Sequence, residues 1–112
     1  SKMANTFKNA VSSAIGTSQT SVYTVPSATT STVIGLTVAN RHSSAITVDV
    51  VVTDSSASAS VFLVKAATIP VGGALVPIGG DQKIVLETTD ILKVTSNTAS
   101  SADAIVSVLE QT

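Results

Sequence analysis

Residues 45–53 read Ala-Ile-Thr-Val-Asp-Val-Val-Val-Thr, and this stretch decides the fold. Apolar β-branched side chains stand at every second position from Ile46 to Val52, with threonine and aspartate between them. Because successive side chains of a strand point to opposite faces, this alternation predicts a β-strand with one buried face. Val51 falls on the other face of that strand, so we expect it to point outward and to be exposed.

The stretch before it follows the same pattern. Residues 32–40 place Ile34, Leu36 and Val38 on one face, and the polar residues 41–44 connect them to the next strand. Two alternating stretches joined by a short polar connection are typical of a β-hairpin. We therefore expect residues 32–40 and 45–53 to pair with each other.

Other stretches have the composition of short strands bounded by turn residues. They are residues 21–25, 60–65, 74–78, 83–87, 91–95 and 104–109. Residues 7–15 fit a helix or a strand, because Phe7, Val11 and Ile15 satisfy both spacings, but the small polar residues among them favour a strand. The serine-rich residues 54–60 predict an exposed hairpin loop.

About eight to ten short strands separated by turns predict an all-β fold. We expect a single-domain antiparallel β-sandwich of jelly-roll or Ig-like type over residues 1–112, with residues 1–5 as a flexible N-terminal segment. The glycine pairs at residues 72–73 and 79–80 are interpreted as turns. They do not form a phosphate-binding loop, because that motif runs from a strand into a helix.

The amino-acid composition excludes several classes of site and partner. The chain of 112 residues has no Cys, no Trp, one His and 12% charged residues, whereas 33 residues are Ser or Thr. Without Cys there is no disulfide framework and no thiolate site. No apolar run approaches the ~18 residues of a membrane span, so we expect no membrane insertion. The basic residues are scattered singly, which predicts no nucleic-acid partner. They are Lys2, Lys8, Arg41, Lys65, Lys83 and Lys93.

Few residues are candidates for catalysis or metal binding. His42 lies in a polar connection beside Arg41 and has no carboxylate or nucleophile spaced to assist it. The carboxylates are Asp49, Asp54, Asp81, Glu87, Asp90, Asp103 and Glu110. Four of them (Asp54, Asp81, Asp90 and Asp103) are expected at turns, where aspartate accepts hydrogen bonds from nearby backbone N–H groups. We predict no catalytic, cofactor-binding or metal-ligating residue, and no enzyme activity.

The low charge points toward assembly. Globular domains carry about 25% charged residues, roughly twice the 12% found here. Outward strand positions are then expected to hold Ala, Val, Ser and Thr, which leaves apolar surface for a partner to bury. Aromatic residues make up only 3% of the chain. Broad contacts in a homo-oligomer or a lattice therefore fit better than a ligand cleft.

Several blocks of the sequence also resemble a known class of proteins. In order along the chain they are residues 7–10 (Phe-Lys-Asn-Ala), 15–18 (Ile-Gly-Thr-Ser), 22–26 (Val-Tyr-Thr-Val-Pro), 33–40, 63–65 and 69–87. Their order is similar to that in small virion-associated proteins of tailed bacteriophages, marine ones in particular, which are classed as structural or hypothetical. The resemblance spans Phe7 to Leu109. Thr89-Asp90 stands where it leads us to expect Gly-Asp, which predicts a different backbone conformation for that turn.

The resemblance implies a structural role in the virion, in a decoration, neck or tail component assembled in the host cytoplasm. It implies packing against copies of the chain, with a trimer preferred, and against other virion proteins. It brings no catalytic residue and no cofactor. The alternative is a binding module whose loops recognise a glycan or protein of the host surface. This alternative has less support, because a sugar-binding surface needs exposed aromatic rings, whereas Tyr23 and Phe62 fall within expected strands.

Overall fold

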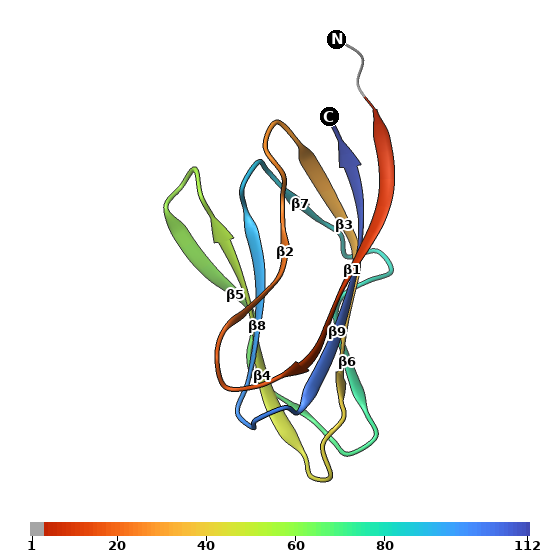
Figure 1. The fold of residues 1–112 in the computed structure, drawn as a ribbon, viewed down its shortest axis with the longest axis vertical. Helices are drawn as coiled ribbons and strands as arrows, with labels where there is room; N and C mark the ends of the chain where they lie inside the picture. Colours follow the sequence, from red (N-terminus) through yellow and green to blue (C-terminus); the bar gives the residue numbers. More distant parts are fainter. Residues whose placement is uncertain (1–3) are drawn as a thin grey trace.

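The computed structural model describes residues 4–112, which form nine strands and no helix. Two antiparallel sheets pack face to face (Figure 1), and the predicted all-β sandwich is confirmed. Sheet A has the order β1 (Asn5–Ile15), β9 (Ala102–Gln111), β3 (Thr30–Asn40) and β6 (Ala74–Ile78), and β7 (Ile84–Leu86) also pairs with β3. Sheet B has the order β2 (Thr20–Thr24), β8 (Ile91–Ser96), β4 (Ile46–Asp54) and β5 (Ala59–Ile69).

Strand pairing is nested along the chain. The first strand pairs with the last, β2 pairs with β8, β3 pairs with β6 and β7, and β4 pairs with its neighbour β5. The first half of the chain thus pairs with the second half in antiparallel order, as in one long hairpin, and the resulting strand pairs are divided between the two sheets. In Figure 1 the red β1 and the dark blue β9 accordingly run side by side.

The core lies between the sheets, and every strand contributes to it. It consists of Val, Ile, Leu and Ala side chains at the inward positions, and no aromatic residue is among its fully buried members. Leu36 on β3 and Leu92 on β8 are among its largest buried side chains. Sheets that pack face to face lie about 10 Å apart, a spacing that branched aliphatic side chains fill well.

The predicted hairpin of residues 32–40 with 45–53 is wrong. These stretches became β3 and β4, which lie in opposite sheets, and residues 41–45 cross from one sheet to the other. Alternation identifies the buried face of a strand but not its neighbour. Both strands bury their apolar rows in the same core from opposite sides, so the pattern is the same as in a hairpin.

Asn40 fixes this crossing. Its side chain is buried, and its Nδ2 donates to the carbonyl oxygens of Ser44 (2.9 Å) and Ile69 (3.0 Å). Its Oδ1 accepts a hydrogen bond from the backbone N–H of His42 at 2.7 Å. One amide therefore ties the β3–β4 connection to the end of β5. These bonds satisfy backbone groups of the connection and of Ile69, the last residue of β5.

Two side chains differ from their predicted environment. Val51 does lie outside the core, but it is only 7% exposed, because its cross-strand neighbours Phe62 and Lys93 flank it on the outer face of sheet B. Ile34 was expected to point inward with Leu36 and Val38. An irregularity in the β3–β9 register between Val33 and Gly35 leaves Ile34 half-buried, and Val33 occupies the core instead.

The N-terminal stretch is a strand, as the small polar residues indicated. Phe7 and Val11 face outward on β1, and only Ile15 joins the core. The segment expected to be flexible, residues 1–5, includes residues 1–3, which lie outside the described part. Ala4 exchanges two backbone hydrogen bonds with Thr112, and Asn5 pairs with Gln111.

The turn between β7 and β8 keeps a backbone that suits glycine. Thr89 has a φ of 67°, in the left-handed region that favours glycine. That this turn differs in backbone conformation from its counterpart in the resembled proteins stays a prediction. A β-branched residue is strained there. Thr89 Oγ1 lies 2.6 Å from Ser55 Oγ, and this hydrogen bond offsets part of the strain.

The core prediction can be tested at Leu36. Leu36→Ala leaves a cavity between the sheets, so we expect the free energy of unfolding to fall by about 2–5 kcal/mol. Urea denaturation followed by circular dichroism measures it. Val71→Ala, at a side chain that is 59% exposed in the turn between β5 and β6, serves as the control and should change stability by less than about 0.5 kcal/mol. Equal losses in both variants would contradict the described packing.

Candidate functional site

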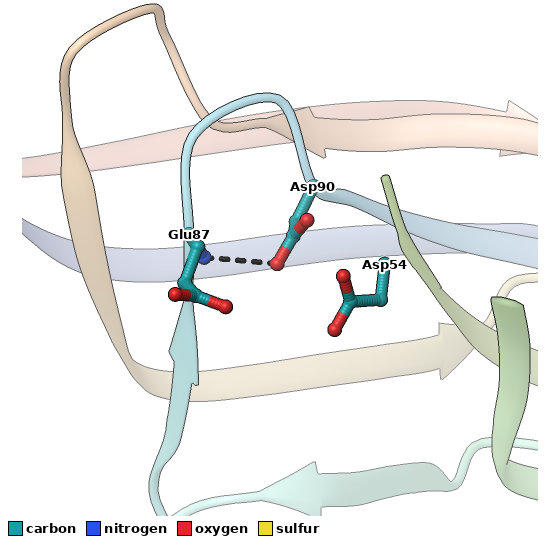
Figure 2. Close-up of side chains that lie close together, drawn as sticks. All are labelled: Asp54, Glu87 and Asp90. Carbon is teal, nitrogen blue, oxygen red and sulfur yellow. Dashed lines mark hydrogen bonds between the residues drawn. The ribbon is translucent and has the colours of Figure 1, made fainter. Parts of the chain in front are cut away.

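Three carboxylates gather at one end of the sandwich (Figure 2). Asp54 ends β4, whereas Glu87 and Asp90 flank the turn between β7 and β8. One oxygen from each lies within 4.8 Å of the others. Asp81, which is near Glu87 and Asp90 in the sequence, is not part of this cluster. Asp54 joins it because the β4–β5 loop folds back against the β7–β8 turn.

The buried member of this cluster is used to hold two turns. Asp90 Oδ1 accepts the backbone N–H of Ser55 at 3.0 Å, and Asp90 Oδ2 accepts the backbone N–H of Glu87 at 2.9 Å. Asp54 Oδ1 accepts the backbone N–H of Ala57 at 3.1 Å and the hydroxyl of Ser56. These bonds, the backbone one foremost, hold the pKa of Asp54 below its usual range. Both aspartates thus act as turn acceptors, as the sequence predicted.

The cluster offers little to a metal ion. Calcium takes six to eight oxygen ligands, and magnesium requires near-octahedral geometry. Three carboxylates are present, and those of Asp54 and Asp90 already accept hydrogen bonds from the turns. The exposed Glu87 carboxylate is the member of the cluster with the most access to solvent.

The turn-holding role makes a testable distinction. Asp90→Ala leaves the N–H groups of Ser55 and Glu87 without their acceptor, so we expect a loss of about 1–3 kcal/mol in unfolding free energy. Glu87→Ala keeps both bonds and should be nearly neutral. Thermal denaturation with and without EDTA completes the experiment, and we expect no change in Tm on chelation. A drop in Tm with EDTA, or an equal loss in both variants, would instead indicate a bound cation.

A second polar cluster joins the two sheets between their edge strands β1 and β2. Tyr23 on β2 donates its hydroxyl proton to Glu110 Oε2 on β9 at 2.6 Å, and Ser31 Oγ on β3 lies 2.6 Å from the same hydroxyl. Lys8 Nζ on β1 lies 3.0 Å from Glu110 Oε1. Four strands therefore meet around the Tyr23 hydroxyl and the buried Glu110 carboxylate.

The environment of this cluster shifts the pKa values of Tyr23 and Glu110. Burial, reinforced by the hydrogen bond to Glu110, raises the pKa of Tyr23 to about 12. The hydrogen bond from Tyr23, followed by the contact with Lys8, lowers the pKa of Glu110. Both groups thus stay in the protonation states that the hydrogen bond needs, a neutral phenol and a carboxylate, through the neutral range. The arrangement stabilises the fold and leaves no nucleophile activated.

The Glu110 shift gives stability a pH dependence. Its pKa is lower in the folded state than the ordinary value of about 4.3, so the unfolded state binds more protons as the pH falls. The contribution is present above that value and is lost as the pH drops through the folded-state pKa. We expect urea denaturation between pH 6 and pH 2.5 to show a smaller acid-dependent loss for Glu110→Gln than for wild type. Asp81→Asn, in the exposed β6–β7 loop, should follow wild type; a Glu110→Gln curve parallel to wild type would contradict the assignment.

The other candidate residues are dispersed. His42 lies on the β3–β4 connection, and its neighbour Arg41 pairs with Asp103 at 3.1 Å. Asp103 lies within β9 and not at a turn, which corrects the sequence prediction. Its carboxylate accepts the backbone N–H of Ala14, and this bond, followed by Arg41, lowers its pKa. Asp49 accepts the backbone N–H of Ala66 at 2.7 Å. None of these contacts joins His42 to a carboxylate.

Sequence reasoning missed the role of Glu110 with Ser31 and Tyr23, although a signal was present. Ser31 and Glu110 extend by one step the inward rows that end in Val33 and Val108. A polar residue at an inward position must find a partner, because burying it alone is costly. Tyr23 is the one aromatic residue with a hydroxyl that could reach both.

Among residues 4–112 there is no helix of the length and hydropathy needed to span a bilayer.

Comparison with known proteins rests on the fold. No protein-family model matches the sequence. No curated protein sequence matches it either. The structure is similar to a chain in a solved structure described as the acidic stable capsid structure of Helicobacter pylori bacteriophage KHP30, with a TM-score of 0.57. The similarity covers 99% of this chain and 94% of the other at 9% sequence identity, so it shows a shared fold over nearly the full length of both.

Proposed function

We propose that this chain is a non-enzymatic structural protein of a bacteriophage particle. The observation that carries the proposal is the fold similarity to a chain of a phage capsid structure, which extends over 99% of this chain and 94% of that chain. The comparison therefore spans nearly all of both chains and is not confined to one sheet or one hairpin. The sequence resemblance to small virion proteins of tailed phages supports the same role.

The strand order supports it further. Nested pairing of the first strand with the last, and so inward to β4 with β5, is the arrangement of a jelly roll when β6 and β7 are counted together as the partner of β3. Double-sheet jelly rolls are frequent in viral capsid proteins. We assign the whole chain, residues 1–112, to one such domain. A fold alone does not define a function, so the virion role is tested by looking for the chain in purified particles.

The proposed mechanism is packing. The chain takes a decoration, neck or tail position in a virion assembled in the host cytoplasm, self-associates, with a trimer as the preferred state, and packs against other virion proteins. The 12% charged residues and the eight exposed large apolar side chains of the described part support this. Recognition of a host surface through loops has less support, because Phe7, Tyr23 and Phe62 all lie in strands. A marine host remains a prediction of the sequence resemblance.

Quantitative mass spectrometry of purified particles tests the role. We expect to detect the chain in gradient-purified particles of the phage whose genome encodes it. Its copy number per particle should be a substantial fraction of that of the major capsid protein. It should stay bound after a high-salt wash, because its surface offers few charges for a salt-labile contact. A non-structural protein from the same genome is the control. Recovery of the chain only in the soluble fraction would overturn the proposal.

A further inference from the structure

The outer face of sheet A is apolar and uncharged across its centre. Residues on neighbouring strands line up there in rows that the register defines. One row joins Phe7, Leu109, Thr32 and Val85 across β1, β9, β3 and β7. A second joins Val11, Ile105 and Thr37 across β1, β9 and β3.

The large side chains of these rows are exposed. Phe7 is 75% exposed, Val11 72% and Ile105 44%. Of the eight exposed large apolar side chains in the described part, these three and Val85 lie in the two rows, and Val76 lies on the adjoining edge strand β6. Isolated exposed apolar residues are ordinary, whereas a contiguous set on one sheet face marks an interaction surface.

Charge separates this face from the opposite one. The outer side of sheet B carries Lys93 beside Val51, and Lys65, whose Nζ lies 5.3 Å above the Phe62 ring. On sheet A the charged pair Arg41–Asp103 lies at the end of the face, beyond the Val11 row. Lys8 lies beside the rows, and its charge is paired with Glu110. A partner for this face therefore needs no charge and must itself present apolar, uncharged surface.

The same face provides a projection and a hollow. Between the two apolar rows lies a row of small residues, Asn9, Ser107 and Gly35. A hollow of about 290 Å³ opens there, lined by Phe7, Lys8, Asn9, Ile34, Ser107 and Val108. The exposed Phe7 ring stands at its wall. An aromatic side chain that enters a pocket on the partner is the usual anchor of a protein interface.

We propose that the outer face of sheet A is buried against a second copy of this chain, with the Phe7 ring of one copy in the hollow of the next. This deepens the proposed function and rests on its self-association. An uncharged face is complementary to a second uncharged face. Because copies of a single chain present the same surface, that surface must carry both the projecting Phe7 ring and the hollow that receives it. The five exposed apolar side chains supply on the order of 400 Å². The threonine, serine and half-buried aliphatic residues between them bring the face toward the ~800 Å² per partner of a stable interface.

Matched lysine substitutions test the assignment. Val11→Lys places a charge in the second apolar row, on the edge strand β1, and Val61→Lys makes the same change at an exposed valine of β5 in sheet B. Neither removes a core side chain, and circular dichroism verifies that both fold. Light scattering after size exclusion, over a wide concentration range, measures the mass. We expect an oligomer for wild type and Val61→Lys, and for Val11→Lys a dissociation constant at least about tenfold higher.

The outcomes separate the two proposals. A wild-type oligomer that Val11→Lys leaves intact would overturn the interface while leaving the virion role in place. A wild type that stays at 11.2 kDa at every concentration would overturn both the interface and the self-association. Mass spectrometry of particles would still decide the virion role on its own. Phe7→Ser provides the second variant, since the anchor role predicts the same dissociation without any added charge.

Discussion

The packing of two aliphatic layers against each other is the constraint on which the rest of the structure depends. Inward valine, isoleucine, leucine and alanine side chains from every strand fill the space between the sheets, and no fully buried aromatic residue helps them. Side chains of this size fill only a narrow gap. The sheets must therefore stay close along their length, and polar groups at the ends of the inward rows must be satisfied by neighbours at short range. The joint hydrogen bonds of Glu110 with Tyr23, and those of Asn40, meet that requirement.

Much of the secondary structure could be predicted, because alternation is a local property. The strands over residues 30–40, 46–54 and 74–78 appear where their patterns indicated, and residues 54–60 contain the loop between the paired strands β4 and β5. Which strands are neighbours could not be predicted. A strand reveals its buried face, but β3 and β4 present the same pattern whether they pair or face each other across the core.

The candidate site was less accessible to sequence reasoning for a related reason. Asp54 meets Glu87 and Asp90 only because the β4–β5 loop folds against a turn more than thirty positions later in the chain. Val51 was correctly placed outside the core, but its exposure depends on Phe62 and Lys93 in two other strands. The apolar face of sheet A likewise needs the register of five strands. Phe7 and Val11 become one surface with Ile105 and Val85 only when β1, β9, β3 and β7 are aligned.

The position of the last two strands has a consequence for how the molecule forms. β8 lies between β2 and β4, and β9 lies between β1 and β3, so the C-terminal strands occupy the middle of both sheets. A chain emerging from the ribosome can close the β4–β5 hairpin early, but β1 has no partner until the far end of the chain is released. Such a topology has a high contact order and folds slowly. Until β9 arrives, the edges of β1 and β3 stand open, and premature termination before residue 102 would leave sheet A without its central strand.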